Sequence, residues 1–174
     1  MNKIKDNPFR ILGLPANSPE RDIQKQLSLI NRLLEIGKQK ELDYDFTTLG
    51  AFERNKDNVR TAYNAISSEK ERFNFSTFWF ISFTNVDQLA FEKIKANKFD
   101  KAIELWETTI ESDKVTTQNI SAYHNLPVIY LLKSVENNKV DYTILNRACK
   151  LRVKLAASEY FREFADNLTG DLGN

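Results

Sequence analysis

The stretch NPFRILGLPANSPERDIQKQLSLINRLLEIG, residues 7–37, decides how the first part of this chain folds. Asn7 followed by Pro8 predicts a helix start, because Asn caps free N–H groups and proline fits the first helical position. Gly13 predicts the end of this short helix, since glycine readily adopts a positive φ there. The stretch therefore opens with a short helix and a tight corner.

A longer helix is predicted after the corner. Asn17-Ser18 offers a second cap and Pro19 a first helical position, and Glu20 and Asp22 stand in the first turn, where the helix dipole favours acids. Gly37 is expected to end this helix. Its apolar residues recur at helical spacing and predict a buried stripe of Ile23, Leu27, Ile30 and Leu34.

Residues 38–55 carry mixed charge without periodicity, which predicts a loop whose Asp43 and Asp45 are solvated. A third helix is expected from residues 56–58, with its apolar face continuing to Phe73. The segment FNFSTFWFISF, residues 73–83, is apolar around most of the helical circumference and predicts a helix buried on both flanks, with a lipid-binding patch as the alternative. The predicted face of the third helix is Val59, Ala62, Tyr63, Ile66 and Phe73.

From Asn85 the pattern predicts helical hairpins and no strands, so the expected fold class is all-α. Pro127 should kink or restart the helix over 117–136, Asn137-Asn138 should break the chain, and Asp141 should cap the following helix. A last turn or two is expected at 158–167, before a frayed tail. The predicted buried residues include Val86, Leu89, Ala90 and Ile94 in the first of these helices and Leu145, Ala148, Cys149, Val153 and Ala156 in the fourth.

Composition excludes several classes of function. The 174 residues carry a net charge of +1, a poor footprint for nucleic acid or anionic membranes. No apolar run is long enough to span a bilayer, and the N-terminus has no apolar core typical of a signal peptide. The single cysteine, Cys149, cannot form an internal disulfide, which fits a cytoplasmic location.

Catalytic and cofactor chemistry also lack support in the sequence. One cysteine and one histidine supply too few ligands for a typical zinc site, and five scattered glycines form no phosphate-binding loop. His124 lies within a predicted helix and is expected to be a packed or rim histidine rather than a catalytic one. The sequence therefore predicts no metal, no cofactor and no enzymatic activity.

The segments NPFRILGL and SPERDIQKQL resemble the J-domain of heat-shock co-chaperones, in which a short aromatic-rich helix ends in Leu-Gly-Val before a small-residue corner and a second helix. The third helix adds Ala62-Tyr63, Ile66-Ser67 and Arg72 to this resemblance. The match covers residues 7–75 and implies a J-domain-like helical domain over residues 1–83.

One departure from that family concerns activity. J-domains stimulate ATP hydrolysis by a partner chaperone through a His-Pro-Asp tripeptide just after the second helix. Here the tripeptide would fall at Glu35-Ile36-Gly37, and none of its three residues is present. The resemblance therefore implies the fold without the activating motif.

Residues 84–174 resemble tetratricopeptide repeats, which are antiparallel helix pairs whose stacked faces bind partners. The segment YHNLPVIY, residues 123–130, resembles the start of a second repeat. A generic helical bundle explains the same pattern, so both architectures stay open, and the two domains are expected to be rigidly joined. The first repeat rests on Ala90, Asn97, Phe99, Ala102 and Trp106.

Arg21, Lys25 and Arg32 form, with Ser28, a ridge opposite the predicted apolar stripe of the second helix. In J-domains the basic face of this helix meets an acidic patch on the chaperone ATPase. The chain is therefore predicted to be a non-enzymatic protein-interaction adaptor with a protein partner. The alternative is a divergent co-chaperone that binds a heat-shock chaperone ATPase through this ridge, and a plain solvated face would explain the same residues. The sequence leaves the oligomeric state open.

Overall fold

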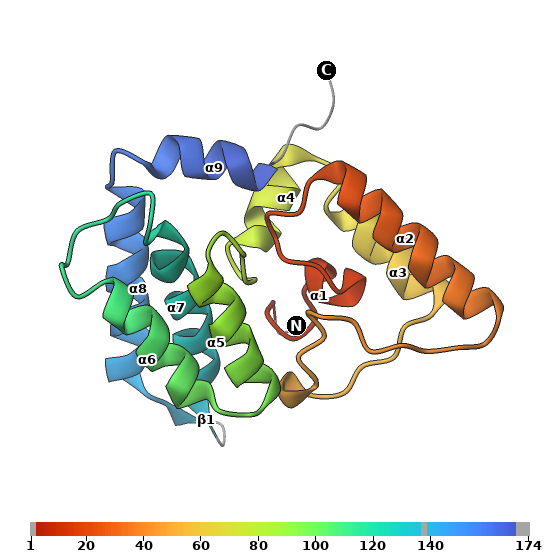
Figure 1. Cartoon of the computed structure of the whole chain (residues 1–174), viewed down its shortest axis with the longest axis horizontal. Helices are drawn as coiled ribbons and strands as arrows, with labels where there is room; N and C mark the ends of the chain where they lie inside the picture. The colour runs from red at the N-terminus through yellow and green to blue at the C-terminus, as the bar shows by residue number, and fades with distance from the viewer. Residues whose placement is uncertain (1–2, 137–138, 170–174) are drawn as a thin grey trace. The chain divides into compact units, whose positions relative to one another are not determined.

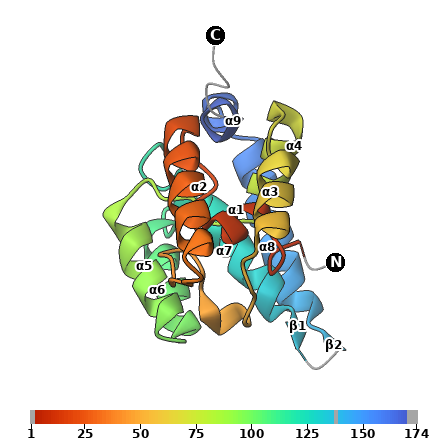
Figure 2. The ribbon, with the colours of Figure 1, turned by 90° about the vertical axis from the view of Figure 1, so that its right-hand side faces the viewer.

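The computed structural model describes residues 3–136 and 139–169 and is all-helical, as predicted (Figure 1). One exception to the predicted absence of strands is an antiparallel pair of two-residue strands, β1 (Val135–Glu136) and β2 (Lys139–Val140), shown in Figure 2. The predicted break at Asn137-Asn138 and most of the predicted frayed tail lie outside the described residues. No helix in the described part of the chain has the length and apolar character needed to cross a membrane.

The described chain divides into two compact units. Unit 1 contains the residues up to Trp79 together with Ala165–Thr169, and unit 2 contains Phe80–Phe164. The identification of a J-domain-like and a tetratricopeptide-like domain, and a rigid connection between them, stay predictions.

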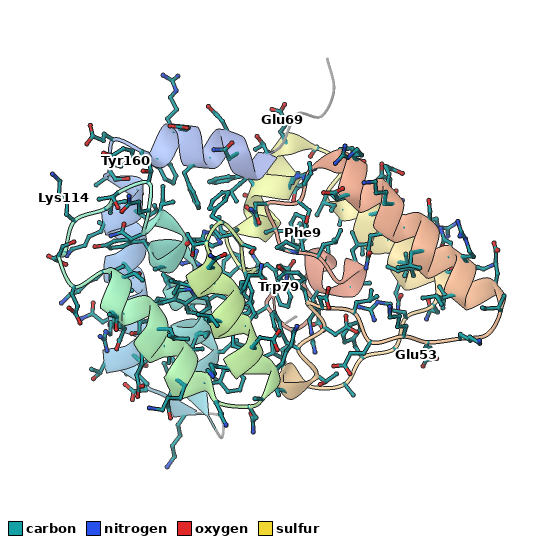
Figure 3. All side chains as sticks on the ribbon, in the orientation of Figure 1. Phe9, Glu53, Glu69, Trp79, Lys114 and Tyr160 are labelled. Carbon is teal, nitrogen blue, oxygen red and sulfur yellow. The ribbon has the colours of Figure 1, made fainter. Side chains whose placement is uncertain are left out.

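Unit 1 begins with the helix and corner that the sequence predicts. Helix α1 spans Pro8–Leu12, and the Asn7 side chain accepts a hydrogen bond from the Phe9 N–H at 3.1 Å. Gly13 ends α1 with φ of 67°. Phe9 and Trp79, both labelled in Figure 3, are fully buried, and the Trp79 indole N–H donates to the Leu14 carbonyl at 2.8 Å. The corner after α1 is therefore held by the buried Phe9 ring on one side and by the hydrogen bond from Trp79 to Leu14 on the other.

Helix α2 spans Glu20–Glu35 and runs beside α3 (Lys56–Ala65) in Figures 1 and 2. Of its predicted stripe, Ile23 and Ile30 are buried, while Leu27 and Leu34 are half-buried. The predicted cap at Ser18 was wrong, because the Ser18 hydroxyl donates to the Pro15 carbonyl and Pro19 occupies the cap position. Gly37 follows the end of α2 with a positive φ, as predicted.

The third predicted helix is two helices. Ile66 ends α3, and the Ser68 hydroxyl accepts the Glu71 N–H to cap α4, which spans Glu69–Ser76. The predicted helix over residues 73–83 was therefore wrong beyond Ser76. Trp79, Phe80 and Ile81 are fully buried in non-helical chain, where burial rather than helical periodicity explains their apolar character.

The loop over residues 38–55, which includes a short 3₁₀ helix, η1 (Thr47–Leu49), is anchored by buried charge. Asp45 is only 4% exposed, so its predicted solvation was wrong, whereas Asp43 is exposed. The Asp45 carboxylate accepts hydrogen bonds from two nitrogens of the Arg54 guanidinium and from the Leu42 N–H. Arg10 of α1 donates to the carbonyls of Asp45, Phe46 and Gly50. These bonds tie the loop to α1.

Unit 2 consists mainly of consecutive packed helices. Helix α7 (Ile120–Lys133) is buried along its first eleven residues and continues through Pro127, so the predicted restart does not occur. Asp141 caps α8 as predicted, accepting the Thr143 and Ile144 N–H groups. The other helices are α5 (Asn85–Lys95), α6 (Phe99–Thr109), α8 (Tyr142–Ala156) and α9 (Phe161–Thr169), the last crossing the division between the units.

Three predicted core positions of α8 and one of α5 were wrong. Cys149 and Ala156 are exposed, Val153 is 66% exposed and Leu89 is 54% exposed. Ala148 is buried as predicted, and Leu151 and Leu155 complete the core side of α8. The apolar residues of α8 are spread over two faces, and the sequence pattern alone did not separate them.

A buried polar cluster joins α5, α6 and α7. Asp87 accepts the Trp106 indole N–H at 2.8 Å and an Asn125 amide N–H at 3.2 Å. Asn125 also accepts the Ile81 N–H and donates to the Ile81 carbonyl, both at 2.9 Å. Every one of these groups therefore has a partner, which is the condition for polar groups to be tolerated in a core.

We expect removal of a tyrosine hydroxyl to have opposite effects on stability at two positions of α7. The buried Tyr123 hydroxyl has no hydrogen-bond partner among the described residues, and burial raises its pKa, whereas the Tyr130 hydroxyl donates to Glu107. We expect Tyr123→Phe to stabilise the protein by about 1 kcal/mol, because an unsatisfied buried polar group is removed. The matched change Tyr130→Phe should destabilise it by about 1–2 kcal/mol. Urea denaturation of both variants tests this, and a Tyr123→Phe variant less stable than the wild type would contradict it.

Candidate functional site

The exposed side of α2 carries all three predicted site residues. We call Arg21, Lys25, Ser28 and Arg32 the basic face; all four are exposed, and they lie opposite the buried Ile23 and Ile30. The structure therefore brings Arg21, Lys25 and Arg32 together on one surface. Together with Gln24 and Leu29 these residues line a shallow hollow along the helix.

The basic face is only partly neutralised by its own helix. Asp22 Oδ1 lies 3.7 Å from Arg21 Nε and 3.3 Å from Lys25 Nζ. The Arg21 and Lys25 side chains remain 79% and 65% exposed, and such solvated pairs contribute about 0–1 kcal/mol. Arg32 has no ion pair among the described residues. A partner could therefore compete for these cations at small cost.

Two exposed apolar side chains accompany the basic face, and sequence reasoning missed both. Leu29 is 38% exposed, and Ile36, just beyond the helix end, is 61% exposed. They are spaced seven residues apart, the same spacing as Lys25 and Arg32, so the periodicity could have revealed them. The surface of α2 thus combines positive charge with apolar area, a combination suited to protein contacts.

The segment Glu35-Ile36-Gly37, where the J-domain resemblance would place the activating tripeptide, is exposed along its length. Gly37 has φ of 64°, and no atom lies within 4 Å of the position that a Cβ would take. The Lys38 N–H donates to the Leu33 carbonyl at 2.9 Å and closes the helix end. The segment therefore supplies a helix end with one exposed apolar side chain.

The start of α2 is held by two residues on which the J-domain resemblance rests. The Tyr63 hydroxyl of α3 donates to Glu20 Oε1 at 3.2 Å, and Gln24 Nε2 donates to the same tyrosine oxygen at 2.7 Å. The buried Arg72 guanidinium of α4 donates to the Ser18 carbonyl and to Glu20 at 3.4 Å. Burial lowers the pKa of Arg72, and Glu20 opposes that shift. Glu20 thus anchors the first turn of α2, the helix that carries the basic face.

The groups considered for catalysis are not assembled into a site in the described part of the chain. His124 is buried, with its ring centroid 5.4 Å from that of Phe164. Cys149 is exposed on another helix, and Asp45 is engaged by Arg54. Among residues 3–136 and 139–169, no group of three or more His, Cys, Asp or Glu side chains is arranged to hold a metal ion.

The residues behind the tetratricopeptide resemblance serve helix packing in unit 2. Ala90, Ala102 and Trp106 are fully buried where α5 and α6 pack together. Asn97 adopts a positive φ of 56° in the turn between those helices, as predicted. The segment 123–130 is buried in α7. Except for Asn97, which is exposed in that turn, these residues are buried and present no group to a partner.

A scan against protein-family models, a search of curated proteins and a search of solved structures each found no match.

Proposed function

We propose that this chain is a non-enzymatic adaptor that binds an acidic surface of another protein through the basic face of α2. The adaptor would be a degenerate J-domain-like helical domain joined to a tetratricopeptide-like helical domain, acting in the cytoplasm. Docking would place carboxylates near Arg21, Lys25 and Arg32 while Leu29 and Ile36 supply apolar contact.

The observation that carries this proposal is the exposure of three cations and two large apolar side chains along one side of α2. A single exposed apolar side chain is common on protein surfaces, but here Leu29 and Ile36 both border the same three cations. Basic charge accelerates encounter with an acidic partner, and apolar contact slows dissociation. Together they favour an interaction surface over a merely solvated one.

A second candidate is a divergent co-chaperone that binds a heat-shock chaperone ATPase through the same face. The convergence of Tyr63 and Arg72 on Glu20 favours it, because these resemblance-bearing residues position the helix that would make the contact. The two candidates predict different effects on the rate of ATP hydrolysis by a chaperone. A co-chaperone accelerates ATP hydrolysis by the purified chaperone, whereas the adaptor leaves the hydrolysis rate unchanged.

Charge reversal at Lys25 and Arg32 tests the binding face. A photo-crosslinking amino acid at Ser28 should capture a partner from lysate of the native host, and the captured protein should then bind directly when purified. The double variant Lys25→Glu/Arg32→Glu should weaken that binding at least about tenfold, because like charges now oppose the acidic surface. Added salt should weaken binding of the wild type, because it screens the attraction.

Arg60→Glu is the matched control, since Arg60 is an exposed cation of α3 with a side chain 76% exposed. It should leave binding unchanged. Binding of the purified partner that survives reversal of Lys25 and Arg32 would overturn the proposed face. Several-fold stimulation of chaperone ATP hydrolysis by the purified protein would replace the adaptor by the second candidate.

A further inference from the structure

The hollow on the basic face of α2 has a regular outline. Its lining residues divide into two groups of four that share Lys25 and Ser28, and within each group the spacing is i, i+3, i+4 and i+7. Four residues at this spacing form the hole into which a side chain of a facing helix packs. The first hole is formed by Arg21, Gln24, Lys25 and Ser28, and the second by Lys25, Ser28, Leu29 and Arg32.

Ser28, which both holes share, leaves them open. It is the smallest of the lining residues, and its hydroxyl donates to the Gln24 carbonyl of its own helix at 2.9 Å. One edge of the first hole is held in place, because Gln24 Nε2 donates to Glu20 Oε1 and to the Tyr63 hydroxyl, both at 2.7 Å. An incoming side chain would therefore meet a partly pre-organised surface, which lowers the entropic cost of binding.

Both holes are positively charged. Arg21 and Lys25 belong to the first hole, Lys25 and Arg32 belong to the second, and no carboxylate lines either of them. The neighbouring Asp22 makes only solvated ion pairs, with Arg21 and with Lys25. A partner that places apolar side chains in the holes should therefore carry carboxylates beside them.

The surface of α2 offers side chains rather than backbone groups to a partner. The N–H and carbonyl groups along the hollow are bonded within the helix, so a strand would find no edge to pair with. A helix, by contrast, presents side chains at the three- and four-residue intervals that match successive holes. The hollow extends from Arg21 to Arg32, which is about 16 Å along the helix axis and suits contact over about three turns.

Given the binding role proposed for the basic face, on which this step rests, we propose that the acidic surface it meets is an amphipathic helix. The apolar side chains of that helix enter the two holes, and its flanking carboxylates meet Arg21, Lys25 and Arg32. Leu29 and the exposed Ile36 add apolar contact toward the C-terminal end of α2. Contact over about three turns covers less than the roughly 800 Å² per partner of a standard interface, so the complex is weak and reversible.

A synthetic acidic peptide tests this partner class. The peptide has about five turns, is held helical by a hydrocarbon staple on its outer side, and carries leucines facing α2 with glutamates beside them. Its binding to the full chain is measured by fluorescence anisotropy and located by ¹H–¹⁵N NMR. We expect a Kd on the order of 10–100 μM and chemical-shift changes concentrated on α2.

Two matched peptides separate helical shape from charge. The first has no staple and carries proline at a central outward position, so it keeps its acids and leucines but not the helix; it should bind at least about tenfold more weakly. The second keeps the staple but has alanine in place of the leucines, and it should bind at least about fivefold more weakly because apolar contact in the holes is lost.

Variants of the chain locate the binding. Lys25→Glu/Arg32→Glu should abolish binding of the helical peptide, whereas Arg60→Glu, on α3, should leave it unchanged. A helical peptide that fails to bind, that binds no better than either matched peptide, or that still binds the double variant would overturn the helical partner. None of these results concerns the natural partner, whose own binding to the Lys25→Glu/Arg32→Glu variant decides the proposed function separately.

Discussion

Asp45→Asn is expected to destabilise the protein by about 3–5 kcal/mol, the range found when one partner of a buried ion pair is removed. Asp45 is 4% exposed, and its carboxylate is hydrogen-bonded by Arg54, whose side chain is 11% exposed. The buried Arg10 donates to the Asp45 backbone carbonyl at 2.8 Å and is attracted electrostatically by the carboxylate. Both guanidinium groups lie against the Phe52 ring, at 4.6 Å and 4.7 Å from its centroid. Burial already lowers the pKa of Arg10, and Asp45 opposes that shift. Without the carboxylate, two like charges would share one desolvated site.

Asp43→Asn is the control for this prediction. Asp43 stands two positions away in the same loop but is exposed, so its neutralisation should change stability by less than about 0.5 kcal/mol. Urea denaturation followed by far-ultraviolet circular dichroism measures both variants. Equal midpoints for Asp45→Asn and the wild type would mean that the buried pair contributes nothing, contrary to the geometry.

Gly13→Ala is expected to lower the free energy of unfolding by about 2–5 kcal/mol, the sum of two effects. Gly13 has φ of +67°, a conformation that costs a residue with a Cβ about 1–2 kcal/mol. An added Cβ would also lie 2.5 Å from both Cβ and Cδ1 of Leu42. The Leu42 Cβ is fixed by its backbone, so relief requires the loop to move away from α1.

Gly37→Ala separates these two effects. Gly37 has nearly the same φ, +64°, but nothing lies within 4 Å of the added Cβ. It should cost only the backbone contribution of about 1–2 kcal/mol. The difference in unfolding free energy between the two alanine variants therefore measures the steric clash with Leu42. Equal losses of unfolding free energy in the two alanine variants would show that the loop moves away from the added Cβ at no cost.

Local chemistry allowed the sequence to predict much of the helical framework. Asn7 and Asp141 are caps whose side chains accept N–H groups two or three residues ahead, so a short stretch contains all the information. Gly13 and Asn97 mark turns for the same reason. The basic face of α2 was also predictable, because helical periodicity places Arg21, Lys25 and Arg32 on one side once the helix is known.

The predictions were wrong where contacts between residues distant in the sequence determine the structure. Asp45 is buried because Arg54 and the loop fold around it, and nothing near LDYDF in the sequence indicates that arrangement. The segment after Ser76 is not helical although its apolar density suggested a helix, since side chains can be buried in either conformation. Cys149 and Val153 looked like core residues because apolar residues recur at helical spacing on both the buried and the exposed side of α8. Only the packing of α7 on α8 distinguishes them.

The backbone at Ile81 is hydrogen-bonded by a side chain far away in the sequence, Asn125 of α7. The Asn125 amide bonds both the N–H and the carbonyl of residue 81, as a neighbouring strand would, across 44 positions of sequence. Backbone groups are common to nearly all residue types, so the hydrogen bonds themselves would tolerate most substitutions at position 81 except proline. Position 125, by contrast, needs an amide of one particular reach. The hydrogen bonding of this non-helical segment should therefore depend on residue 125, inside a distant helix, more than on the side chain at residue 81.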